Sequence, residues 1–72
     1  MTLDKVKRGC KCRILRVALE EVRAQAMRMG LCEGEMVECY ETIPSGPVVV
    51  KKNRQEIAIG RGLARLIEVS AN

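Results

Sequence analysis

The sequence predicts a mainly β protein: a small closed or nearly closed barrel of five short strands, with one short α-helix inserted after the first strand. Short apolar or alternating segments separated by turn residues recur along the chain, and one segment between residues 19 and 30 has helical periodicity instead. The chain has 72 residues with one Tyr and neither Phe nor Trp. A single domain over residues 1–72, with a small aliphatic core, is therefore expected.

The first strand is predicted over residues 10–17, "CKCRILRV". Cys12 and Ile14 alternate with basic residues there, which is typical of a strand with one buried face. Leu15 and Val17 break this alternation, so either a bulge or burial on both faces is expected near Leu15.

A short amphipathic helix is predicted to follow, because the apolar period changes from two to about 3.6 residues. Its start lacks a Ser, Thr, Asp or Asn cap near Ala18. Gly30 is expected to end it in a left-handed conformation, with Leu31 folding back onto the last turn. Four apolar residues form the predicted core-facing stripe: Leu19, Val22, Ala26 and Met29.

The second half of the chain reads as strands joined by tight turns. "PSGP" at residues 44–47 and Asn53–Arg54 are turn signals, and Gly60 and Gly62 precede one expected helical turn. The remaining strands are expected at residues 36–43, 48–52, 56–59 and 67–69. The core is predicted to contain Ile14, Val22, Met29, Leu31, Val37, Val48, Val50, Ile57, Ile59 and Ile67.

Composition argues against several classes of function. The net charge is +4, but the basic residues are dispersed and lack neighbouring aromatics, so nucleic-acid binding is not expected. No apolar run approaches the roughly 20 residues that span a bilayer, and the N-terminus lacks a secretory signal, which predicts a cytoplasmic protein without membrane insertion. With no His, no nucleophile motif and no phosphate-binding loop, we expect no catalytic residues and no enzyme.

The four cysteines leave three alternatives. Cys10 and Cys12, one residue apart on a strand, are candidate ligands for iron or zinc, although the two close pairs of a structural zinc site are missing. A redox pair is the second alternative. The favoured interpretation is that Cys12 and Cys39 are small core residues and that Cys10 and Cys32 lie at the surface or in loops, with no cofactor bound.

In its order of elements the chain resembles the FeoA-like domain, the ferrous iron transport protein A family, which also occurs at the C-terminus of some iron-dependent repressors. The resemblance runs from Leu3 to Val69. It rests on Leu3 and Gly9 before the first strand and on the segments "MRMGLCEGEMVEC", "IPSGPVVV" and "IAIGRGLARLIEV". Glu33 departs from the family, which usually has Pro before Gly34.

The resemblance implies an SH3-like barrel acting as a small cytosolic accessory of the ferrous iron transporter, whose membrane subunit carries a cytoplasmic GTPase domain. It implies protein–protein contact by a monomer or weak oligomer. Three alternatives stay open: a metal-binding chaperone or sensor using Cys10 and Cys12, a nucleic-acid-binding barrel, and an isolated module related to the repressor C-terminal domain. The candidate partner-binding residues are Met27, Leu31, Tyr40, Arg61 and Arg65.

Overall fold

Five antiparallel strands form one sheet in the order β4-β3-β2-β1-β5 in the computed structural model of the chain, which describes residues 1–71. Residue 72, which the predicted domain includes, lies outside the described part. The mainly β fold with one short helix after the first strand is confirmed. The strands are β1 (Lys11–Val17), β2 (Met36–Thr42), β3 (Val48–Lys52), β4 (Gln55–Ile59) and β5 (Ile67–Ala71), and the helices are the 3₁₀ turn η1 (Leu3–Lys5), α1 (Glu20–Arg28) and α2 (Arg61–Ala64).

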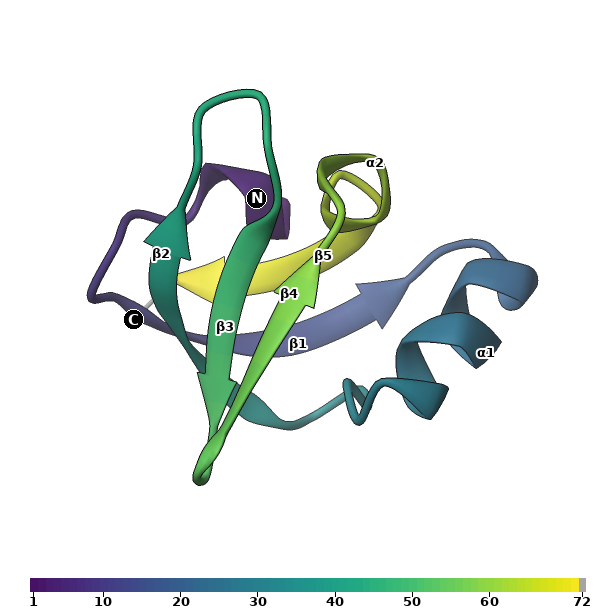
Figure 1. Cartoon of the computed structure of the whole chain (residues 1–72). Coiled ribbons are helices and arrows are strands. Elements are labelled where there is room, and N and C mark those ends of the chain that lie inside the picture. Colours follow the sequence, from purple (N-terminus) through teal and green to yellow (C-terminus); the bar gives the residue numbers. More distant parts are fainter. Residues whose placement is uncertain (72) are drawn as a thin grey trace.

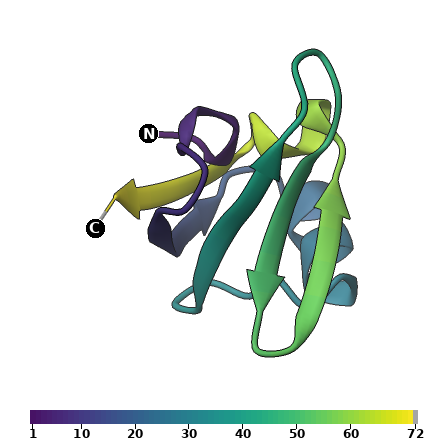
Figure 2. The same cartoon turned by 60° about the vertical axis from the view of Figure 1, so that its left-hand side comes forward.

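The sheet folds over on itself into a small SH3-like barrel. Strands β2, β3 and β4 form one layer, and β1 and β5 cross behind it (Figure 1). The N-terminal segment lies beside β5 (Figure 2), where the Val69 N–H donates to the Met1 carbonyl oxygen at 2.8 Å. Among the described residues, no helix has the length and apolarity needed to cross a membrane.

The core is aliphatic, as predicted. Most of the expected core residues are buried, whereas Val22, Met29 and Ile57 are partly buried and pack against the core. Cys12 and Cys39 each have 0% exposure, which confirms the expectation that they are core residues. The fully buried set is Leu3, Val6, Cys12, Ile14, Val17, Ala26, Leu31, Val37, Cys39, Val48, Val50, Ile59, Ala64, Ile67 and Val69.

The C-terminal end of α1 has the predicted form. The Gly30 N–H donates to the Met27 carbonyl oxygen at 3.0 Å, and the Leu31 N–H donates to the Ala26 carbonyl oxygen at 2.9 Å. These two bonds, with Gly30 at φ +89°, are the pattern of a Schellman motif. Leu31 and Ala26 are thereby brought together in the core.

The prediction that Leu19 belongs to the core-facing stripe of the helix is wrong. Leu19 is the N-cap residue of α1, with extended backbone angles of φ −95° and ψ 130°, and it is 55% exposed. A helical stripe extends only over residues with helical backbone angles. The side chain of the cap therefore points away from the core that Ala26 reaches.

A glycine bulge closes the beginning of the β1–β2 pair. The Gly9 N–H donates to the Cys39 carbonyl oxygen at 2.7 Å, and the Cys39 N–H donates to the Cys10 carbonyl oxygen at 2.8 Å. Gly9 has φ +87°, and the Cys10 N–H closes a turn onto the Lys7 carbonyl oxygen at 3.1 Å. This is a tight turn followed by a bulge whose first residue must be left-handed.

The same arrangement closes the other end of that pair. The Gly34 N–H donates to the Ile14 carbonyl oxygen at 2.7 Å, and the Ile14 N–H donates to the Glu35 carbonyl oxygen at 2.9 Å. Gly34 has φ +92°. On its other edge, β1 shifts register against β5 between Ile14 and Arg16, which confirms the bulge expected near Leu15.

Candidate partner-binding surface

Helix α1 stands beside the barrel and buries little of itself. Ala26 is the one residue of this fully described helix that is buried. Leu19, the N-cap residue, is exposed, and so are Arg23 and Met27, which lie one turn apart on the helix. Leu19 is 55% and Met27 is 53% exposed, so apolar side chains near both ends of the helix are open to solvent. We call these three residues the α1 face.

Of the two candidate contact residues in this region, Met27 is exposed, as partner contact requires, whereas Leu31 is buried. Leu31 has 1% exposure and belongs to the core, where it was also predicted to lie. The Schellman motif turns its side chain inward. A docking patch shared by Met27 and Leu31 therefore does not form. Beside Met27 the surface is a shallow depression lined by Arg23, Cys32 and Glu33.

Lys52 fixes α1 to the sheet, a role that sequence reasoning missed. Its ammonium donates to the Gly30 carbonyl oxygen at 2.7 Å and forms an ion pair with the Glu35 carboxylate at 2.5 Å. The hydrogen bond from Lys52 lowers the pKa of Glu35 below its usual value. Lys52 shares the inward side of β3 with Val48 and Val50. A lysine at an inward position of a predicted strand is the sequence feature that could have indicated a structural role for Lys52.

Glu33, the residue that departs from the family pattern, also has a structural role. Its carboxylate accepts a hydrogen bond from the Val17 N–H at 3.2 Å. Val17 ends β1 and is buried, so Glu33 satisfies a backbone donor at the point where the chain leaves the strand. A proline there would lack that acceptor.

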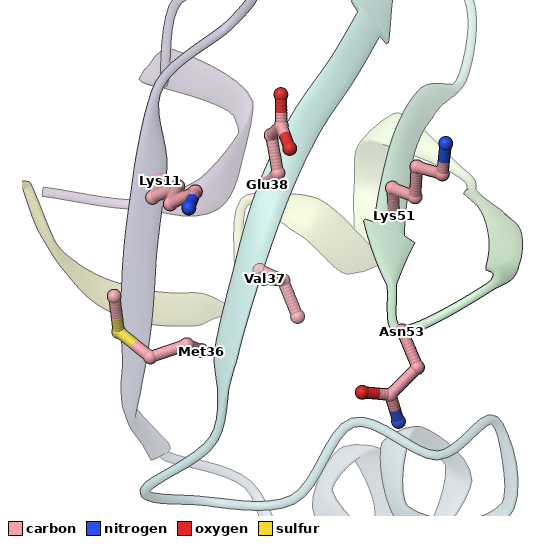
Figure 3. Close-up of a pocket in the computed structure, with 6 residues that line it drawn as sticks. All are labelled: Lys11, Met36, Val37, Glu38, Lys51 and Asn53. Atoms are coloured by element: carbon pink, nitrogen blue, oxygen red, sulfur yellow. The ribbon is translucent and has the colours of Figure 1, made fainter.

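The outer face of the sheet carries a row of alternating charges. Lys11 is paired in register with Glu38, Glu38 with Lys51, and Lys51 with Glu56. Figure 3 shows Glu38 between Lys11 and Lys51. Opposite charges in such cross-strand positions stabilise the sheet by about 0.2–1 kcal/mol per pair. The depression at this place favours neither an anion nor a cation, and its lining residues are Lys11, Met36, Val37, Glu38, Lys51 and Asn53.

Tyr40 lies at a bulge of β2, where the register against β3 shifts between Cys39 and Glu41. Its side chain is 45% exposed, and the Lys51 ammonium lies 5.6 Å from the centre of its ring. Tyr40 stays a candidate for partner contact.

The two candidate arginines, Arg61 and Arg65, differ in whether their side chains already form hydrogen bonds within the protein. Arg61 donates from Nε to the Gly46 carbonyl oxygen at 3.0 Å and from a terminal nitrogen to the Ile43 carbonyl oxygen at 2.8 Å. Arg61 thereby ties α2 to the β2–β3 loop, which sequence reasoning did not anticipate. Arg65 is exposed and stays a candidate contact residue.

The two candidate metal ligands lie in different environments. Cys10 is exposed and Cys12 is buried. Burial raises the pKa of the Cys12 thiol, and the nearby Cys39 and Cys10 thiols raise it further. A thiol held neutral is a poor metal ligand, because the thiolate is the form that binds. In the part of the chain that the structure describes, no three or more His, Cys, Asp or Glu residues are placed to hold a metal ion.

The whole chain is similar to a known family and to several solved structures. The family model for the FeoA domain matches residues 1–71. The crystal structure of an iron uptake regulatory protein (FeoA) has 26% identity and a TM-score of 0.91, covering 100% of this chain and 97% of that one. Iron(II) transport protein A from Clostridium thermocellum has 30% identity and a TM-score of 0.89, covering 99% of this chain and 45% of its own.

A further solution structure, the FeoA protein of Chlorobium tepidum, has 30% identity and a TM-score of 0.83, covering 99% of this chain and 70% of that one. The metal-dependent transcriptional regulator MtsR shares the fold at 14% identity, with a TM-score of 0.85, and the match covers 100% of this chain and 34% of the regulator. No curated protein matches the chain.

Proposed function

Because the chain belongs to the FeoA domain family, which ties this small protein to ferrous iron transport, we propose that it is an accessory of a membrane ferrous iron transporter. It acts by binding the cytoplasmic GTPase-bearing part of that transporter. The observation that carries the proposal is the family match over residues 1–71, which includes every strand and helix of the barrel.

The α1 face supports binding as the mode of action. Leu19 and Met27 are more than half exposed, and exposed apolar surface on a small domain is typical of contact sites. The Schellman motif and the Lys52 hydrogen bond to Gly30 hold the helix in place. A surface that is already ordered loses less conformational entropy on binding. We assign the α1 face to the transporter contact.

We also propose that the chain catalyses no reaction of its own. It has no His, and its two inward cysteines, Cys12 and Cys39, have raised pKa values that keep them neutral. The metal-chaperone alternative is less favoured because Cys12 is buried. The nucleic-acid alternative is less favoured because the outer sheet face alternates Lys11, Glu38 and Lys51 instead of presenting a basic stripe.

A binding measurement tests the proposal directly. The purified chain is titrated by calorimetry against the purified cytoplasmic GTPase-bearing part of the ferrous iron transporter from the same organism. A Met27→Glu variant places a charge in the apolar contact, so we expect affinity to fall by about tenfold or more. Leu66→Glu is the matched control, since Leu66 is 39% exposed and lies outside α1.

Two results would count against the proposal in different ways. If the wild-type chain shows no heat of binding and does not change the rate of GTP hydrolysis, the assignment of the transporter as partner is wrong. If both variants bind as the wild type does, the partner is right and the α1 face is not the contact surface. Circular dichroism melts of both variants check that the barrel stays folded.

A further inference from the structure

Three of the four cysteines, Cys10, Cys12 and Cys39, lie near one another where β1 begins. At the glycine bulge Cys39 lies opposite Gly9 and Cys10, through the 2.7 Å hydrogen bond from Gly9 and the 2.8 Å hydrogen bond to Cys10 described above. The next pairs along the strands are Lys11 with Glu38 and Cys12 with Val37. Since side chains alternate along a strand, Cys12 and Cys39 share the inward face, and Cys10 directly precedes the first residue of β1. Cys12 and Cys39 are buried there, and Cys10 is open to solvent.

We propose that Cys10 and Cys39 are a thiol–disulfide modification site, in which an external low-molecular-weight disulfide oxidises the pair to a cross-strand bond. One backbone hydrogen bond, from the Cys39 N–H to the Cys10 carbonyl oxygen at 2.8 Å, joins the two residues across the bulge. Hydrogen-bonded strands lie about 4.7–4.9 Å apart. Disulfide-bonded residues have Cα atoms about 4.4–6.8 Å apart, so neighbours on adjacent strands are close enough for the bond.

Cys12 is the less suitable partner for Cys10. Residues two apart on a strand have Cα atoms about 6.6 Å apart, at the upper end of the range that disulfides span. The strand would have to contract, and Cys12 is held in register with Val37 by the β1–β2 pairing. The geometry thus selects Cys39 over Cys12.

The first chemical step takes place at Cys10, because Cys39 has 0% exposure. The Cys10 thiolate attacks one sulfur of the external disulfide, breaks its S–S bond and releases one thiolate. The product is a mixed disulfide on Cys10. This intermolecular step needs only an accessible sulfur, which Cys10 has.

The second step closes the bond within the protein. The Cys39 thiolate attacks the Cys10 sulfur, the mixed S–S bond breaks, and the second external thiolate leaves. Two protein thiols are oxidised and one external disulfide is reduced to two thiols. Cys39 starts as a thiol 3.6 Å from the Val6 carbonyl oxygen, and burial raises its pKa. Closure is therefore the slower step and accelerates as the pH rises.

This site is independent of the transporter contact proposed above. Cys10 precedes the start of β1, whereas α1 follows its end at Val17. Oxidation would fix the turn at Gly9 covalently to β2 without touching the α1 face. Loss of transporter binding would leave this proposal unaffected, and absence of the disulfide would leave the binding proposal unaffected.

Oxidation of the reduced, full chain by glutathione disulfide tests the site. The intact mass is followed over time at pH 7 and pH 9, and the bonded cysteines are identified by peptide mapping without reduction. We expect a transient glutathione adduct on Cys10, followed by a product lighter than the reduced chain by two hydrogen atoms and carrying a Cys10–Cys39 bond. The second phase should be faster at pH 9.

Three variants make the test specific. In Cys39→Ala the adduct on Cys10 should persist, whereas Cys32→Ser should close at the wild-type rate. Because Cys39 is a core residue, Cys10→Ser serves as a second variant with an exposed substitution, and in it neither an adduct at Cys39 nor a bond should form in the folded protein. A lasting adduct on wild-type Cys10, or a bond to Cys12 or Cys32, would overturn the proposal.

Discussion

The Lys52 ammonium lies 2.7 Å from the Gly30 carbonyl oxygen, so a charged hydrogen bond joins the end of β3 to the C-terminal end of α1. Gly30 directly follows Met29, the C-cap residue of α1, so its carbonyl group lies beside the helix end that carries partial negative charge. The Lys52 side chain is 22% exposed, which limits the screening of this bond by water. One side chain therefore positions the helix that bears the proposed contact surface.

Replacing Lys52 tests this coupling. In Lys52→Met the alkyl stem is kept and the charged hydrogen bond to Gly30 is lost, so we expect the free energy of unfolding to fall by about 1–2 kcal/mol. Denaturant titration at neutral pH measures the change. Lys7→Met is the matched control, because the Lys7 side chain is exposed and lies outside the strands and helices. Equal losses in the two variants would refute the role given to Lys52.

Acidification should weaken the same region. The Lys52 hydrogen bond lowers the pKa of Glu35 from its ordinary value of 4.5, despite opposing desolvation. A lowered folded-state pKa adds stability above pH 4.5, and this contribution disappears as the pH falls through the folded value. We expect Glu35→Gln to reduce the slope of unfolding free energy against pH in that acidic range. An unchanged slope would show that the ion pair is not energetically coupled to folding.

Gly9→Ala should destabilise the protein through its backbone. Nothing lies within 4 Å of the position that a Cβ would take, but φ is +87°. A left-handed conformation costs about 1–2 kcal/mol for a residue with a Cβ. Gly62→Ala, in α2 and without positive φ, should be neutral or stabilise by up to about 1 kcal/mol. Thermal unfolding of the two variants gives the comparison, and a loss in Gly62→Ala as large as in Gly9→Ala would contradict it.

At the β1 bulge, two neighbouring residues of similar size differ in burial, and comparing their substitutions tests the contribution of the core to stability. Ile14 has 0% exposure and its neighbour Leu15 has 52%. Ile14→Ala should lower the free energy of unfolding by about 2–4 kcal/mol, because burial is lost and a cavity remains. Leu15→Ala should change it by less than about 1 kcal/mol. Chemical denaturation measures both changes in the free energy of unfolding, and equal losses in the two variants would contradict the prediction.

Alkaline solution should destabilise the reduced protein through its buried thiols. Burial raises the pKa values of Cys12 and Cys39 above the ordinary value of 9.0. The contribution of these thiols to stability is complete below pH 9.0 and is lost as the pH rises through the folded-state values. In a reducing buffer, Cys12→Ala should show a shallower loss of stability above pH 9.0 than the wild type. An unchanged loss would mean that ionisation elsewhere dominates.

The sequence predicted correctly those structural features that depend on residues close together along the chain. The Gly30–Leu31 termination of α1 depends on neighbouring backbone groups, and the bulge near Leu15 follows from a break in alternation. Cys12 and Cys39 were correctly placed in the core because each alternates with an aliphatic neighbour. Each of these features is determined by residues only a few positions away along the chain, so it could be predicted from the local sequence pattern.

Sequence reasoning failed where distant segments meet. Leu3 and Val6 enter the core because the N-terminal segment lies against β5, which no short-range pattern reveals. Arg61 was predicted only as a candidate contact residue, and its hydrogen bonds to the carbonyl oxygens of Ile43 and Gly46 were not anticipated. Those bonds depend on how α2 and the β2–β3 loop approach each other.

By itself the sequence determined the kind and order of the elements, the aliphatic character of the core and the family. Periodicity, turn residues and capping residues act over a few positions, so they can be read along the chain. Only the tertiary structure decided that Lys52 holds α1, that Leu19 and Met27 are exposed, and that the Cys39 N–H bonds to the Cys10 carbonyl oxygen. Each of these depends on strand register and on packing between segments far apart in sequence, which are settled only when the whole barrel closes.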